Sequence, residues 1–158
     1  MEDSNDATFR NAMASALRIL ARRDHSVVEL TQKLDRRGYA QDTVQQVVAE
    51  CSRMGYLNDQ RVAGQLIDRM KRRSMGLRRI RHELQKRGME GDRVEAQLLA
   101  GVSPSEERLL VRQAAEKKWK LLSGKPDSRN KMLRLQRFLR YRGFSDSIIV
   151  ETLKEMHL

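Results

Sequence analysis

The sequence has little of what a large hydrophobic core or a membrane span requires. Only 39% of its 158 residues are apolar and 4% are aromatic. Several thin interfaces between short helices, as in a repeat array, are therefore favoured over one large core. No apolar run approaches the roughly 20 residues that cross a bilayer. The single cysteine, Cys51, excludes an internal disulfide and suits a reducing cytoplasm. No motif surrounds it, so we interpret it as a small residue of a helix.

Catalytic and metal-binding signatures are also missing. His25, His82 and His157 lie far apart in sequence and lack cysteine or acidic partners at metal-ligand spacing. There is no glycine-rich phosphate loop. Trp119 could stack on a base, but a single aromatic side chain offers little surface for binding a strand by stacking. We therefore assign Trp119 to the core. The sequence predicts no catalytic residue, no metal and no cofactor, so enzyme is the least supported class.

Positive charge is what the chain has in excess. It carries 32 Lys and Arg against 21 Asp and Glu, a net charge of +11. An excess of this size predicts attraction to a polyanion, most often a nucleic acid or a nucleoprotein. The N-terminal stretch "MEDSNDATF" is acidic and polar, so it is not a secretory signal. We expect residues 1–7 to form a flexible tail.

One short phrase occurs three times, as "LDRRGY" (34–39), "LQKRGM" (84–89) and "LRYRGF" (139–144). Its glycines, Gly38, Gly88 and Gly143, are 50 and 55 residues apart. Around each of them, apolar residues recur at the same five offsets, and this spacing is helical, so each glycine separates two amphipathic helices. From eleven residues before the glycine to ten after it, the apolar sets are Val27, Leu77 and Met132; Leu30, Ile80 and Leu135; Leu34, Leu84 and Leu139; Val44, Val94 and Ile149; Val48, Leu98 and Leu153.

The repeated glycine is typical of a helix end. A helix often ends on a residue in the left-handed region, which glycine adopts without Cβ strain. The large residues that follow, Tyr39, Met89 and Phe144, suit the hydrophobic contact that accompanies such a cap. Basic residues before the glycine offset the negative end of the helix dipole. Part of the arginine preference at 37, 87 and 142 is therefore structural.

Helix start signals agree with this division. "SVVE" (26–29) and "SPSE" (103–106) are capping boxes, and Pro104 occupies the favoured first helical position. Acidic residues stand in the first turn after each glycine, where the dipole favours them. They are Asp42, Asp92 and Asp146.

A further helix precedes each pair, at roughly 8–23, 59–73 and 104–122, and no strand pattern competes with it. The residues that we place inward are Ala12, Ala16, Ile19 and Leu20 in the first helix and Val62, Leu66 and Met70 in the second; the apolar residues of the third include Leu110, Ala114 and Leu121. The sequence thus predicts an all-α, elongated and curved array of three tandem three-helix repeats, about nine helices. The repeats span 8–56, 57–102 and 103–158, with a loop insertion near 123–128 ("SGKPDS").

The charge gathers on the middle helices, and the densest run, residues 69–81, holds seven basic residues and no acid. A solvated helix face is the alternative explanation for any one arginine. Like charges repel, however, and nothing nearby in sequence neutralises this run, which favours an anionic partner. The candidate binding residues are Arg69, Lys71, Arg72, Arg73, Arg78, Arg79, Arg81, Lys86, Arg87, Arg134, Arg137 and Arg140.

A helix-turn-helix transcription factor is the obvious rival, because short helices meet at a glycine turn. In that motif, the helix after the turn presents polar and basic residues to base edges. Here the helices after Gly38 and Gly143 begin with "AQDT" and "SDSI", which are poor surfaces for a phosphate-lined groove.

Four segments resemble the RecX family of regulatory proteins. "GYLNDQRVA" (55–63) resembles the family's junction between its first two repeats, although Val62 stands where an aromatic is usual. "GLRRIRHELQKRG" (76–88) resembles its central signature, and "HSVVELTQKLDRRGY" (25–39) and "LQRFLRYRGFSDSII" (135–149) resemble its first and third repeats. The resemblance covers about residues 12 to 156.

This resemblance implies a partner and a role that composition cannot show. RecX-like proteins bind the RecA recombinase and its filament on single-stranded DNA, lie in the filament groove and typically inhibit it. The expectation is therefore a cytoplasmic, monomeric, non-enzymatic modulator of recombination, DNA repair and the SOS response, with at most weak non-specific DNA binding. The alternative is an autonomous basic DNA-binding protein or a helix-turn-helix-like transcription factor.

Overall fold

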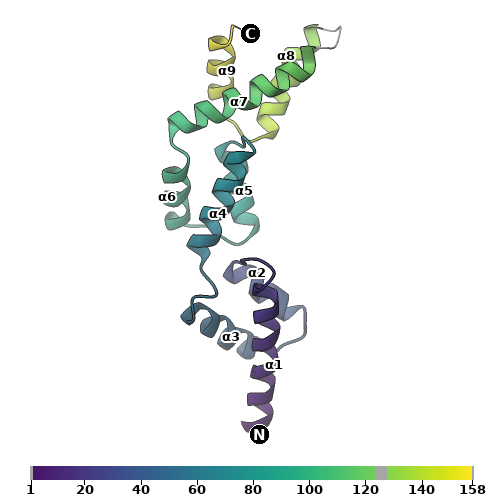
Figure 1. Ribbon diagram of the computed structural model, residues 1–158, viewed down its shortest axis with the longest axis vertical. Helices are drawn as coiled ribbons and strands as arrows, with labels where there is room; N and C mark the ends of the chain where they lie inside the picture. Colours follow the sequence, from purple (N-terminus) through teal and green to yellow (C-terminus); the bar gives the residue numbers. More distant parts are fainter. Residues whose placement is uncertain (1, 124–127, 158) are drawn as a thin grey trace. The chain divides into compact units, whose positions relative to one another are not determined.

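The computed structural model describes residues 2–123 and 128–157, which form nine helices and no strand (Figure 1). The all-α prediction is confirmed, and the predicted helices 59–73 and 104–122 each end within one residue of the observed boundary. The helices are α1 (Glu2–Leu20), α2 (Val27–Asp35), α3 (Gln41–Arg53), α4 (Asp59–Arg72), α5 (Leu77–Lys86), α6 (Asp92–Gly101), α7 (Pro104–Ser123), α8 (Ser128–Tyr141) and α9 (Asp146–Glu155).

The described chain forms two compact units. The first contains the residues up to Ala63 together with Gln85–Glu90, and the second contains Gly64–Leu84 together with the residues from Gly91 onward. In the first unit α1, α2 and α3 pack against one another, and in the second α7, α8 and α9 do the same (Figure 1). The first and third predicted repeats therefore form three-helix bundles. The middle repeat is divided, because α4 and α5 each have residues in both units.

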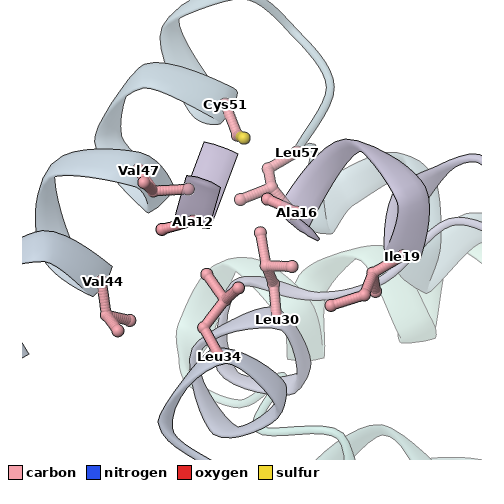
Figure 2. Close-up of a cluster of buried hydrophobic side chains, with 9 residues drawn as sticks. All are labelled: Ala12, Ala16, Ile19, Leu30, Leu34, Val44, Val47, Cys51 and Leu57. Atoms are coloured by element: carbon pink, nitrogen blue, oxygen red, sulfur yellow. The ribbon is translucent and has the colours of Figure 1, made fainter. Parts of the chain in front are cut away.

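The core of the first unit is small and built from short side chains. It consists of Ala12, Ala16, Ile19, Leu30, Leu34, Val44, Val47, Cys51 and Leu57 (Figure 2). Cys51 is fully buried there, and burial raises the pKa of its thiol above the ordinary value. Since a thiolate is the reactive form, this confirms that Cys51 acts as a small apolar helix residue.

The repeated phrase ends a helix in all three places, as predicted. Gly38, Gly88 and Gly143 have φ of 84°, 71° and 92°, which lie in the left-handed region. The apolar residues four and eight positions before each glycine are all buried. Of the large residues after the glycines, Met89 and Phe144 are buried, and the Tyr39 hydroxyl lies 2.9 Å from Ser15 Oγ.

In its second and third copies, the phrase also contacts the preceding repeat. Ser26 Oγ, at the start of α2, donates to the carbonyl of Arg87 at 2.6 Å. Likewise the backbone N–H of Gly76, just before α5, donates to the carbonyl of Arg142 at 2.8 Å. The arginine–glycine dipeptide therefore recurs partly because its backbone docks against the first turn of the preceding middle helix.

Three expectations about local structure need correction. Residues 2–7 are helical rather than a flexible tail, since α1 begins at Glu2 with no proline or glycine up to Leu20 and with an Asp6–Arg10 ion pair at 3.3 Å. The first helix also ends at Leu20 rather than near 23. Trp119 is half-buried rather than in the core, because it flanks the buried stripe of α7. Of the predicted loop insertion, residues 124–127 lie outside the described residues.

Removing the Ser26 hydroxyl is expected to cost about 2 kcal/mol of unfolding free energy. Ser26 Oγ accepts from the Glu29 N–H at 3.1 Å, as in a capping box, and donates to the Arg87 carbonyl. Ser103 forms a capping box with Glu106, but its hydroxyl contacts the side chains of Ser105 and Glu106 and donates to no backbone carbonyl among the described residues. Ser103→Ala should therefore cost about 1 kcal/mol, the usual value of an N-cap, and Ser26→Ala about twice that. Equal losses in a urea titration would show that the bond to Arg87 adds no stability.

Candidate basic interface

The structure divides the predicted binding residues into two groups. In the first group the side chains are exposed and form no ion pair within the described part of the chain. This group contains Arg72, Arg73, Arg78, Arg134 and Arg137. Arg69 and Lys86 are also exposed, but each has an interaction with another part of the protein. The first group keeps its charge available to a partner from outside.

The second group has acidic partners in the folded chain. The pairs are Lys71–Glu106 (2.5 Å), Arg79–Glu83 (3.2 Å), Arg81–Glu95 (2.5 Å), Arg87–Glu29 (3.9 Å) and Arg140–Asp146 (2.5 Å). The expectation that nothing nearby neutralises the 69–81 run is therefore wrong for Arg79, and acids farther along the chain neutralise two more of its residues. The Arg79–Glu83 pair lies within α5, whereas others connect separate helices, for example α4 to α7 and α5 to α6.

In two of these pairs the hydrogen bonds shift the pKa of the carboxyl group. The hydrogen bonds from Arg81 lower the pKa of the Glu95 carboxyl, and the hydrogen bond from Lys71 does the same for Glu106. The bond to Glu95 correspondingly raises the pKa of Arg81. Partly exposed pairs of this kind contribute little stability one by one, but they reduce the charge that the second group can offer to a ligand.

A cavity of about 250 Å³ in the second unit brings the exposed pair Arg72 and Arg73 together with two cations that the prediction did not include. One is Lys117 of α7, and the other is Arg142, directly before the glycine in the third copy of the phrase. Phe138 also lines the cavity. Arg78, Arg134 and Arg137 do not line this cavity. Lys117 could not be found from local charge, because it lies 44 residues beyond Arg73 on a different helix.

Arg142 shapes the backbone of this site. Its guanidinium lies 4.7 Å from the centre of the Phe138 ring and donates to the carbonyls of Arg73 and Ser74. Ser74 is buried with φ of 51°, a conformation that costs a non-glycine residue free energy. The contacts from Arg142 therefore help to hold the turn that presents Arg72 and Arg73. Burial lowers the pKa of Arg142.

Two kinds of site are not found in the part of the chain that the structure describes. No group of three or more His, Cys, Asp or Glu side chains is arranged to hold a metal ion in residues 2–123 and 128–157. None of the described helices is long and apolar enough to cross a membrane.

Acid is expected to destabilise the protein in two pH ranges. Burial lowers the pKa of His25 below its ordinary value of 6.5, although its bond to the Arg23 carbonyl acts in the opposite sense. Below about pH 6.5 the unfolded chain binds this proton more readily than the folded one, so stability falls. The carboxyls of Glu95 and Glu106, whose pKa values are held below the ordinary 4.5 by their ion pairs, stabilise the fold above that pH and lose this contribution below it.

Thermal unfolding at several pH values tests this expectation. The melting temperature should fall between pH 7.5 and 5.5 in the wild type and fall less in a His25→Gln variant, and it should fall again below pH 4.5 in both. A wild-type melting temperature that stays constant down to pH 5.5 would contradict the assignment of His25.

Two models of protein-family domains match this chain, one in its N-terminal part and one in its C-terminal part. Residues 12–51 match the model "RecX, first three-helix domain", and residues 106–153 match "RecX, third three-helix domain". These ranges lie within the two three-helix bundles of the structure, α1 to α3 and α7 to α9.

Similar whole proteins and solved structures agree with these matches. The regulatory protein RecX of Legionella pneumophila is 34% identical over 92% of this chain and 94% of its own length. That of Vibrio parahaemolyticus is 31% identical over 92% and 91%. The crystal structure of RecX from Lactobacillus salivarius has a TM-score of 0.82 at 21% identity, covering 96% of this chain and 98% of that one. At this identity the likeness concerns the fold alone.

Proposed function

The chain belongs to the RecX family of regulatory proteins, and we propose that it regulates the RecA recombinase. In this proposal it binds RecA and the RecA filament on single-stranded DNA, and it lies in the helical groove of the filament. It restrains ATP hydrolysis, strand exchange and the co-protease activity of the SOS response. It acts in the cytoplasm as a monomer and without catalysis of its own.

The observation that carries the proposal is the exposed basic group of Arg72, Arg73, Arg78, Arg134 and Arg137, which lack acidic partners among the described residues. Exposed charges of one sign on α4, α5 and α8 repel one another and are stabilised by an anionic partner. A recombinase filament loaded with DNA is such a partner, because it carries the phosphates of the strand. The cavity around Arg72 and Arg73 would be one contact point.

An autonomous DNA-binding protein is the second candidate, supported by the same charges. The two functions differ in what binding requires once salt is raised. Phosphate contacts with single strands release counterions, so the logarithm of the binding constant falls by about 0.7 per contact per unit of log salt. Binding to bare DNA should therefore weaken steeply, whereas contacts with the recombinase itself should persist.

Co-sedimentation at two salt concentrations tests the proposal. The protein is mixed with single-stranded DNA, or with RecA filaments formed on the same DNA, at about 50 and 200 mM salt, the range over which phosphate-only binding weakens strongly. We expect retention on the filament and loss from bare DNA at the higher salt. Equal retention on both at 200 mM would favour the autonomous DNA-binding protein.

A further inference from the structure

The first unit contains a basic cavity that none of the sequence-predicted binding residues lines. Its volume is about 510 Å³. Apart from Ile19, which is 6% exposed, its lining consists of basic residue types and contains no acid. These residues are Arg18, Arg22, Arg23, His25, Lys33 and Arg37.

Two segments bring these side chains to one place. Arg18 lies in the last turn of α1 and Arg22 lies just beyond its end, whereas Lys33 lies in the last turn of α2 and Arg37 lies just beyond its end. All four side chains line the same cavity. Like charges gathered in this way repel one another when nothing neutralises them.

Little within the described chain neutralises this cavity. Arg23 is ion-paired with Glu29 at 3.0 Å, and Arg18 Nε donates to the Ala14 carbonyl at 3.2 Å. Arg22, Lys33 and Arg37 form no ion pair with any described residue. Three cations therefore remain available around one cavity.

Arg37 differs from its counterparts in the other two copies of the phrase. Arg87 pairs with Glu29, and Arg142 holds the turn at Ser74. Arg37 is exposed instead and forms no ion pair with a described residue. The side chain that serves the structure in two repeats is thus available for a ligand in the first.

We propose that this cavity is a phosphate-binding site. Guanidinium groups offer paired N–H donors that match phosphate oxygens, and an ammonium group adds a point charge. No described Phe, Tyr or Trp side chain lines the cavity, and His25 is only 3% exposed, so the ligand is recognised by its charge and not by stacking of a base. Consecutive phosphates occur in the backbone of a single nucleic acid strand and in a free polyphosphate chain, and the two share this chemistry.

The test compares a cavity variant with a control of equal charge. The cavity variant is Arg22→Gln with Arg37→Gln. The control is Arg36→Gln with Arg93→Gln, two exposed arginines that do not line the cavity, one of them adjacent to Arg37. The probes are a labelled twelve-residue oligothymidylate, followed by fluorescence anisotropy, and inorganic tripolyphosphate, followed by calorimetry, both at low salt.

For at least one probe, the cavity variant should lose about tenfold in affinity, the expected scale for losing charge-assisted bonds, and the control about threefold or less. If the oligonucleotide is that probe, the salt slope should also become shallower by about 1.4, since two contacts are lost. Loss confined to the oligonucleotide identifies the strand backbone as the source of the phosphate, and loss confined to tripolyphosphate identifies a free polyphosphate. Equal affinities of the two variants for both probes would overturn the proposal.

Circular dichroism shows whether each variant is folded. Should the double variant fail to fold, Lys33→Gln replaces it, with Arg36→Gln as the matched single control. Lys33 lines the same cavity from α2, whereas Arg36 does not line it. Equal affinities of these two single variants for both probes would overturn the proposal in the same way.

Discussion

Replacing Gly143 by alanine is expected to lower the free energy of unfolding by about 3 kcal/mol, whereas the same change at Gly38 should cost about 1 kcal/mol. Both glycines have positive φ, so both substitutions introduce local strain. They differ in their surroundings. A Cβ at Gly143 would overlap the backbone nitrogen of Arg79 and lie 2.5 Å from its Cβ, whereas a Cβ at Gly38 would meet nothing within 4 Å.

The size of the difference follows from what would have to move. The obstacle at Gly143 is the backbone of α5, which cannot shift without disturbing the bonds from Gly76 and Arg78 to the phrase of the third repeat. Overpacking of this kind typically costs 1–3 kcal/mol beyond the strain itself. Gly88→Ala should be similarly costly, because its Cβ would lie 2.5 Å from Val28 Cβ.

Denaturant titration of the three alanine variants measures these differences, and Gly38→Ala is the matched control. Similar losses at all three positions would mean that the cap conformation alone decides the cost. The close contacts at Gly88 and Gly143 would then add nothing to the loss of unfolding free energy.

Reversing Arg72 and Arg73 to glutamate should weaken binding to the RecA filament strongly and leave the fold nearly intact. Both side chains are exposed and have no ion-pair partner among the described residues, and surface changes usually fall within about 0.5 kcal/mol. At the interface, two charges change sign against an anionic partner, a net change of four units, and wrong-sign contacts can cost several kcal/mol. The expected loss of affinity is therefore at least about a hundredfold.

The matched control for this reversal is Arg93→Glu with Lys154→Glu. Arg93 on α6 and Lys154 on α9 are also exposed, and neither lines the cavity at Arg72. The control changes the net charge by the same amount, so it removes the same long-range attraction. Affinity for the filament should fall much further for the Arg72→Glu, Arg73→Glu variant than for this control. Circular dichroism shows whether both variants are folded. Equal losses would mean that net charge, and not this site, determines binding.

The parts of the fold that sequence reasoning predicted are those set by local chemistry. A left-handed glycine after a helix, a serine with a glutamate three residues on, and apolar residues at offsets of four all involve neighbours within one or two turns. Gly38, Ser26 and Leu34 therefore behave as predicted. The exception is the start of α1, where a run of polar residues was interpreted as a tail.

Arg79 and Glu83 are four residues apart, so their ion pair was within reach of the same reasoning and was overlooked. Other ion pairs could not be predicted in this way, because their members are far apart in sequence. Lys71 and Glu106 are 35 residues apart, and Arg81 and Glu95 are 14 apart. A count of charges along the chain cannot show which cations the fold neutralises. For the same reason it overlooked Lys117 at one cavity and Arg22 at the other, since each lies on an element outside the densest basic run.

The most direct test of the central claim is the ATPase activity of RecA on single-stranded DNA, titrated with this protein. The proposed regulation predicts that hydrolysis falls as the protein is added and reaches a low plateau. It also predicts that the Arg72→Glu, Arg73→Glu variant needs a much higher concentration for the same effect, while the Arg93→Glu, Lys154→Glu control needs a concentration much closer to that of the wild type. An ATPase rate that does not change with wild-type protein, at concentrations where it is folded and in excess over RecA, would contradict the claim.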